Sequence, residues 1–188
     1  MKQNIAKIIR VASLSPFTAA VTLTIMYAVG IMTDYTQLIA TLCCLTVLPM
    51  LSYPIHLAIP KLRAKGRDSE RSLAIIFSVV GYAVITALCF ALDYPAKVTA
   101  FTLTYLFSGA ILFVCRLFGA RPSGHCCGVS GPIAYLIAFV SPWYAFAALL
   151  LAPVIWSCLE LKRHTLWQCV IGAAISVVAL GISALILL

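Results

Sequence analysis

The chain has 188 residues, of which 63% are apolar and only 10% are charged, and its mean hydropathy is +1.09. A soluble domain is roughly half apolar and about a quarter charged, so this composition excludes an ordinary water-soluble fold. The net charge of +8 does not indicate nucleic-acid binding, because basic residues in a membrane protein first set its orientation and then attract anionic headgroups or substrates. We expect an integral membrane protein whose partners are the bilayer and its lipids, with no nucleic acid.

Seven apolar segments, bounded by charged residues, proline or glycine, follow one another along the chain. Most have the length of a membrane-spanning helix, which needs about 20 residues. They cover residues 11–32, 37–59, 73–92, 98–118, 124–141, 143–161 and 168–188. The first is longer than the apolar part of a secretory signal, so we expect a retained helix. The sequence predicts an all-α fold, a single membrane domain over residues 1–188 built as a polytopic bundle of about seven transmembrane helices.

Basic residues gather on one predicted side of this bundle. If seven helices alternate in direction, the side that holds Met1 also holds the loops 60–72, 119–123 and 162–167. Of the 13 lysines and arginines, only Lys97 falls on the other side. By the positive-inside rule the basic side is cytoplasmic, and we expect the inner membrane of a bacterial or archaeal cell.

Eight cysteines are scattered along the chain, most of them within apolar runs. No Cys-x-x-Cys motif occurs. Four of the cysteines are sequence neighbours, as Cys43-Cys44 and Cys126-Cys127. We interpret the cysteines as small buried apolar side chains. No Cys/His pattern with the spacing of a metal site is visible, so the sequence predicts neither a metal nor a cofactor.

A polar motif, Arg121-Pro122-Ser123-Gly124-His125, precedes the fifth apolar segment. Pro122 ends the preceding structure, and Ser123 is a favourable N-cap for a helix that we expect to begin here. Gly124 lets a ligand approach the backbone, and the free N–H groups of a helix start attract anions. Arg121 adds a guanidinium suited to phosphate, and His125 can give a proton to a leaving oxygen. The alternative is a simple helix start with an interfacial histidine.

Two further polar elements lie on the same predicted side. His164 and Gln168 are four residues apart. If the seventh helix includes both, the Gln168 carbonyl accepts the imidazole N–H and directs the other nitrogen outward, as for a nucleophile or base. A basic cluster at a helix end is, alternatively, a topological anchor. The basic loop 60–72 suits a bound phosphate or is merely solvated, and His56 reads as a satisfied intramembrane histidine beside Pro54.

These motifs resemble the type 2 phosphatidic acid phosphatase superfamily, whose fold is shared with vanadium haloperoxidases. That family carries Lys-x6-Arg-Pro, then Pro-Ser-Gly-His, then Ser-Arg-x5-His-x3-Asp. Residues 122–125 match the second motif completely, and residues 157–168 keep the spacing of the third, with Cys158 for Arg and Gln168 for Asp. In the first motif Lys65 and Arg71 are one residue too close, and Ser72 replaces the proline. The resemblance covers roughly residues 60–175.

The resemblance implies a phosphatase/haloperoxidase-like core over residues 60–175, with motif loops at 60–72, 121–125 and 157–168, preceded by an N-terminal helical hairpin at 1–59. It implies a phosphomonoester or pyrophosphate hydrolase that passes through a phosphohistidine, with no metal and no cofactor. His164 would be the nucleophile, Gln168 its orienter and His125 the general acid. Arg121 or Arg163 would compensate for the arginine that Cys158 replaces. The implied phosphate-binding set is Lys65, Arg71, Arg121, Ser123, Gly124 and Arg163.

The expected function is therefore that of a lipid phosphatase, acting on phosphatidate, phosphatidylglycerol phosphate or a polyprenyl pyrophosphate. One alternative is a catalytically inactive relative that binds a lipid headgroup or a partner, as the substituted motif positions suggest. A second alternative is a small membrane transporter component. The near absence of ionisable residues within the predicted spans argues against transport, because such residues mark substrate pathways.

Overall fold

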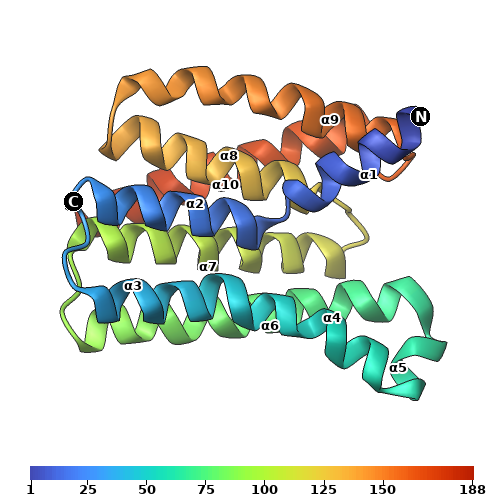
Figure 1. Ribbon diagram of the computed structural model, residues 1–188, viewed down its shortest axis with the longest axis horizontal. Coiled ribbons are helices and arrows are strands. Elements are labelled where there is room, and N and C mark those ends of the chain that lie inside the picture. The colour runs from blue at the N-terminus through green and yellow to red at the C-terminus, as the bar shows by residue number, and fades with distance from the viewer.

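The computed structural model describes residues 1–188, apart from the side chain of Arg67. The described residues form helices joined by short turns, and no strand occurs among them. Figure 1 shows the helices running side by side along the long axis of the molecule. In chain order they are α1 (Lys2–Ala12), α2 (Ser15–Ala28), α3 (Tyr35–Leu42), η1 (Cys43–Val47), α4 (Leu48–Ala58), α5 (Pro60–Ala64), α6 (Gly66–Ala91), α7 (Ala96–Leu117), α8 (Gly124–Phe139), η2 (Pro142–Leu150), α9 (Leu151–Glu160) and α10 (Leu166–Leu187).

The all-α fold is confirmed, and the long apolar helices are compatible with an integral membrane protein. Within the described part of the chain, five stretches are long and apolar enough to cross a membrane: Tyr35–Ala58, Asp68–Ala91, Ala96–Leu117, Pro142–Glu160 and Leu166–Leu187. The bent pair α1–α2 makes a sixth if it counts as one span. The fifth predicted segment forms α8, whose 16 residues fall short of the usual spanning length. By length and composition the structure thus gives five or six spans, and the count of seven stays a prediction.

The sequence predicted one helix over the first apolar segment, residues 11–32, and the structure does not show it. The chain forms α1 and α2 instead, and these two helices are bent by 51° at the break between them. Leu14 has extended backbone angles (φ −63°, ψ 137°), and Pro16 lies in the first turn of α2. Proline has no N–H to donate, so it suits the start of a helix and ends a preceding one. The break places the end of α1 beside the candidate site.

The structures of the second apolar segment and of the loop 60–72 also differ from the prediction, at Pro49 and at Gly66. The second segment contains a π-helical stretch, η1, which ends two residues before Pro49. This wider turn accommodates a residue that lacks the N–H of a regular helix. The predicted loop 60–72 is mostly helical, forming α5 and the start of α6. The chain turns between these helices at Gly66, which has φ +67°. Arg71 and Ser72 therefore lie on a helix rather than in a loop.

The last two segments also begin differently. The sixth begins as a 3-10 helix, η2, before the regular helix α9. The seventh helix, α10, begins at Leu166 with Thr165 as its N-cap. His164 therefore lies just outside this helix. The condition that the seventh helix includes both His164 and Gln168 is not met.

Helices α7, α8 and α10 pack against one another at the centre of the bundle. Aromatic rings form an edge-to-face chain through this core, from Tyr82 through Tyr105 and Phe101 to Tyr135, with centroids 4.8 to 5.2 Å apart. Such pairs add about 0.5–1.5 kcal/mol each beyond the burial of their area. The rigid centre fixes where the helix ends lie, and these ends carry the polar motifs.

The polar motifs meet at one end of the bundle. Figure 1 shows the N-terminus, α5, the α7–α8 connection and the α9–α10 connection at the same end. The α2–α3, α6–α7 and α8–η2 connections and the C-terminus lie at the opposite end. This arrangement agrees with the alternating directions that the seven apolar segments predicted.

Candidate functional site

The loop before α8 is held against the start of α10. Ser123 is the N-cap of α8, and its hydroxyl accepts a hydrogen bond from the Cys126 N–H at 3.3 Å. The Ser123 N–H donates to the Gln168 carbonyl oxygen at 2.8 Å, which ties the two motif regions together. The prediction that a helix starts at residues 123–125 is confirmed, and the first turn of this helix carries His125.

Gly172 on α10 permits this close approach. A Cβ added at Gly172 would lie only 2.3 Å from the Ser123 carbonyl oxygen and 2.9 Å from its nitrogen. No side chain fits there unless the loop moves away, so the contact between the two motifs depends on a glycine outside both of them.

His164 is oriented by two oxygen acceptors. Its Nδ1 lies 3.2 Å from the Arg121 carbonyl oxygen and 3.3 Å from Gln168 Oε1. Since both partners are acceptors, Nδ1 carries the proton, and Nε2 is left with its lone pair. The predicted contact between His164 and Gln168 thus forms although His164 precedes the helix.

Gln168 also completes a capping box at the start of α10. Its Oε1 accepts a hydrogen bond from the Thr165 N–H at 3.1 Å, and the Thr165 hydroxyl accepts one from the Gln168 N–H at 3.3 Å. A capping box satisfies two N–H groups that a helix start otherwise leaves without partners. Gln168 therefore has a structural role as well as its contact with His164.

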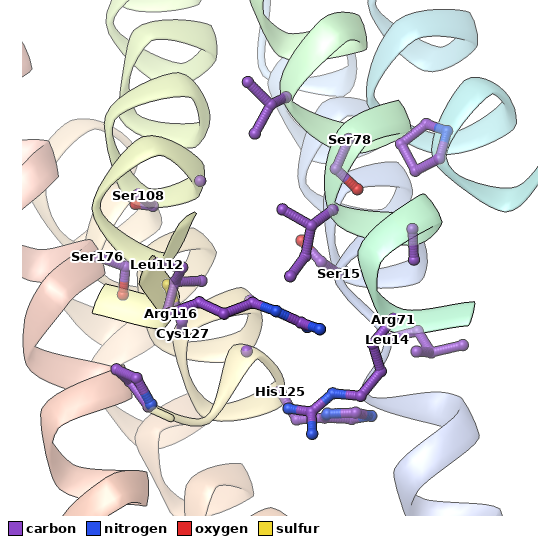
Figure 2. Close-up of a pocket in the computed structure, with 18 of the residues that line it drawn as sticks. Leu14, Ser15, Arg71, Ser78, Ser108, Leu112, Arg116, His125, Cys127 and Ser176 are labelled. Carbon is purple, nitrogen blue, oxygen red and sulfur yellow. The ribbon is translucent and has the colours of Figure 1, made fainter. Parts of the chain in front are cut away.

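Both histidines line one cavity of about 570 Å³ at the motif end of the bundle. Figure 2 shows His125 among the residues that line it. Gly124 lies in its wall, and a Cβ added there would meet nothing within 4 Å, so the backbone is open to a ligand. Five guanidinium groups belong to the same lining, against two carboxylates, Asp68 and Glu70. The arginines are Arg10, Arg71, Arg116, Arg121 and Arg163. A cavity of this charge is suited to an anion.

Three of the sequence-predicted site residues do not line this cavity. Lys65 is exposed at the turn between α5 and α6. Ser123 is fully buried, and its hydroxyl faces Cys126 and Cys158 because it caps α8. Gln168 does not line the cavity but contacts the Nδ1 of His164. Ser123, which the resemblance would have hold a phosphate oxygen, thus does not line the cavity, whereas Arg71, Arg121, Gly124 and Arg163 all do.

Two arginines of the cavity were missed as site residues. Arg10 lies at the end of α1, where a basic residue was interpreted only as a signal of orientation. Arg116 lies in the last turn of α7, and its Nη2 donates to the Ser72 hydroxyl at 3.0 Å. Figure 2 shows Arg116 extending from α7 across the cavity toward α6. The sequence signal was present, since both residues belong to the basic side, but only the fold shows which cations face the cavity.

The surroundings of His164 favour its neutral form. Burial lowers the pKa of His164 below its usual value, and the positive charge of Arg71 lowers it further. The hydrogen bonds to Gln168 and to the Arg121 carbonyl act in the opposite direction, but they do not cancel the shift. At neutral pH the imidazole is therefore uncharged, and its Nε2 is available as a nucleophile or as a base.

His125 presents a nitrogen without a protein partner. Its Nε2 is shielded from solvent and makes no hydrogen bond among the described side chains and backbone. The ring contacts the backbone of Arg10. Figure 2 shows the side chain of Arg71 reaching from α6 toward His125. A buried polar atom without a partner is costly, and a ligand oxygen in the cavity would satisfy it.

A group of cysteines lies behind the loop that precedes α8. The sulfurs of Cys126, Cys158 and Cys169 lie within 4.8 Å of one another, and all three residues are buried. The Cys158 sulfur is 3.7 Å from the Ser123 hydroxyl oxygen. Their burial agrees with the sequence prediction, and their meeting in space adds a cluster that the sequence pattern does not show. The three cysteines come from α8, α9 and α10, so no local spacing could reveal them.

No family model matches this chain, and neither a curated protein nor a solved structure gives a match.

Proposed function

We propose that this chain is an integral membrane phosphatase that hydrolyses the phosphomonoester or pyrophosphate of a lipid through a phosphohistidine. The observation that best supports the proposal is that His125 and His164, distant in sequence, line one cavity with five arginines. Two imidazoles beside a cluster of cations are the groups that phosphoryl transfer through a histidine requires. The substrate class is that of phosphatidate, phosphatidylglycerol phosphate and polyprenyl pyrophosphates.

His164 is the nucleophile in this proposal. Its Nδ1–H is held by Arg121 and Gln168, so Nε2 can attack phosphorus while the P–O bond of the leaving group breaks. Burial, followed by the charge of Arg10, lowers the pKa of His125 to about 4. The negative charge of a bound phosphate raises this pKa, so His125 takes up a proton with the substrate and then gives it, as imidazolium, to the leaving oxygen. Water then attacks the phosphohistidine and gives a proton back to His125, which releases inorganic phosphate and restores both imidazoles.

The arginines that line the cavity stabilise the negative charge that phosphoryl transfer spreads over the phosphate oxygens. Arginine binds such oxygens with two parallel hydrogen bonds, which positions the phosphorus as well as stabilising the charge. Arg71 comes from α6, Arg121 from the loop before α8 and Arg163 from the turn before α10. In this proposal Arg121 or Arg163 takes the place of the arginine that the resemblance would put at position 158, because Cys158 faces the buried sulfurs instead.

The lipid character of the substrate rests on the position of the cavity. Its lining includes Arg121, His125 and His164, which lie at the ends of apolar helices. Helix ends are at the level of the lipid headgroups when such helices span a bilayer. The cations at this end favour the cytoplasmic face under the positive-inside rule. We propose the inner membrane of a bacterial or archaeal cell as the location.

The test is phosphate release by the purified protein from a panel of lipid phosphates in mixed micelles. We expect His164→Ala to abolish turnover and His125→Ala to reduce it by about 10²–10⁴-fold, the usual range for general acid catalysis. His56→Gln is the matched control, because His56 is also a buried histidine but does not line the cavity. A His164→Ala variant as active as the unaltered protein would contradict the proposal.

A second candidate function is binding of a phosphorylated lipid headgroup without turnover. It is favoured by the engagement of Gln168 in a capping box and by its lack of the negative charge that stabilises an imidazolium. Saturable binding of lipid phosphate with no phosphate release, unaffected by His164→Ala, would establish this alternative.

A further inference from the structure

Three thiols from three different helices converge behind the candidate site. Cys126 lies in the first turn of α8, Cys158 near the end of α9 and Cys169 in the first turns of α10. Their exposed fractions are 0%, 1% and 0%, and their sulfurs all lie within 4.8 Å of one another. The other described cysteines do not join this group. The phosphatase chemistry proposed above does not use it.

The spacing of the sulfurs is close to that of a metal-thiolate site. Zinc–sulfur bonds are about 2.3 Å long, so three sulfurs around one ion lie about 4.0 Å apart in a plane and slightly closer in a tetrahedron. Movements of less than about 1 Å would bring the three sulfurs to this spacing. The Ser123 hydroxyl oxygen, 3.7 Å from the Cys158 sulfur, offers an oxygen for a fourth position.

The charge of such a site is compensated by the fold. Three thiolates and one divalent cation carry a net charge of −1. Cys126 and Cys169 lie within the first four residues of α8 and α10, so both are near a helix N-terminus. Each helix N-terminus is equivalent to roughly +0.5 charge, so the two ends together offset the buried negative charge.

We propose that Cys126, Cys158 and Cys169 form a binding site for one thiophilic divalent cation of the zinc class. Binding converts three thiols to thiolates, so that the ion and three R–SH groups give one tris-thiolate complex of charge −1 and release three protons. Because soft sulfur ligands select ions such as Zn²⁺ and Cd²⁺ over Mg²⁺ and Ca²⁺, the site discriminates by ligand chemistry. It would join three helices that carry the candidate catalytic loops.

The test is a titration of the reduced, metal-free full chain in detergent with Cd²⁺ as the spectroscopic probe. We expect one equivalent of Cd²⁺ to bind with an ultraviolet thiolate-to-metal charge-transfer band. Zn²⁺ should displace it, Mg²⁺ should not, and three protons should be released per ion in weakly buffered solution.

Single variants assign the ligands. Cys126→Ser, Cys158→Ser and Cys169→Ser should each weaken binding by at least about tenfold, the lower end of what losing a ligand or its support costs. Cys43→Ser and Cys115→Ser, which alter cysteines outside the cluster, should bind like the unaltered chain.

Three outcomes would overturn the proposal. These are absence of saturable binding by the unaltered chain, release of fewer than two protons per ion, and undiminished binding by the variant that lacks all three cysteines. The proton count needs no variant, so it decides even if a substituted chain fails to fold. Since no readout involves phosphate release, failure of the phosphatase proposal leaves this result unaffected.

Discussion

The chemical state of His164 is set by a few groups around one ring. Burial and Arg71 hold its pKa below the usual value, and the hydrogen bonds to Gln168 and the Arg121 carbonyl act against this shift. In Arg71→Gln the repulsive charge is removed, so the pKa of His164 should rise. Proton NMR of the ring, recorded against pH without substrate, measures this directly. A His164 pKa that stays the same or falls in Arg71→Gln would contradict the assignment.

The pKa of His164 also determines how the rate of the proposed reaction depends on pH. Only neutral His164 attacks phosphorus, so kcat/KM should fall as the pH drops through the lowered pKa and should be independent of His164 protonation at neutral pH. Arg71→Gln should move this acid limb to higher pH, because its His164 protonates more readily. An Arg116→Gln variant is the control, since Arg116 is another cation of the cavity but is not among the groups that shift this pKa.

Two variants of Gln168 distinguish its role in orienting His164 from its role in capping α10. Gln168→Glu keeps the acceptor for Thr165 and His164 and adds a negative charge, so it should keep the thermal midpoint and raise the pKa of His164. Gln168→Ala removes both contacts and should lower the free energy of unfolding by about 1 kcal/mol, as for a lost cap. Thermal unfolding together with ring NMR checks both. An equal loss of stability in the two variants would show that capping does not act through the acceptor oxygen.

At the scale of the elements, the contact between the loop before α8 and α10 holds the two histidine motifs together. Gly172→Ala would place a Cβ 2.3 Å from the Ser123 carbonyl oxygen, so the loop must move away. We expect a loss of about 1–3 kcal/mol of stability, as for overpacking, and a loss of phosphate release although both histidines remain.

Gly181→Ala is the matched control for this prediction. It lies on the same helix, and an added Cβ meets nothing within 4 Å. It should leave phosphate release unchanged and stabilise the helix by about 0.5–1 kcal/mol. Equal activity of the Gly172 and Gly181 variants would mean that the close approach is not needed for function.

The elements also show what the sequence could and could not predict. Apolar length predicted the helices, and the capping chemistry of Ser123 predicted the start of α8 correctly. The break at Leu14, the π-helical turn η1 and the 3-10 helix η2 were not predicted, because apolar composition does not distinguish these geometries. Of the site, the motif residues around His125 and His164 were found by pattern. Arg10, Arg116 and the cysteine cluster were not, since they depend on tertiary packing alone.

At the scale of the whole molecule, one end of the bundle carries the cavity and nearly all the cations. If this end faces the cytoplasm, an impermeant maleimide added to intact cells should label Asp93→Cys, at the α6–α7 turn, and should leave Ser69→Cys, near the start of α6, unlabelled. The unaltered chain gives the background from the native cysteines. Labelling of Ser69→Cys alone would place the cavity on the outer face.

The central claim is that the two imidazoles act on a single phosphorus, and a structure of the protein with bound orthovanadate tests it most directly. Vanadate adopts the five-coordinate geometry of phosphoryl transfer. We predict a bond between vanadium and His164 Nε2, with His125 Nε2 within hydrogen-bonding distance of the apical oxygen opposite and arginine side chains on the equatorial oxygens. Vanadate bound elsewhere, or in contact with only one of the two histidines, would contradict the claim.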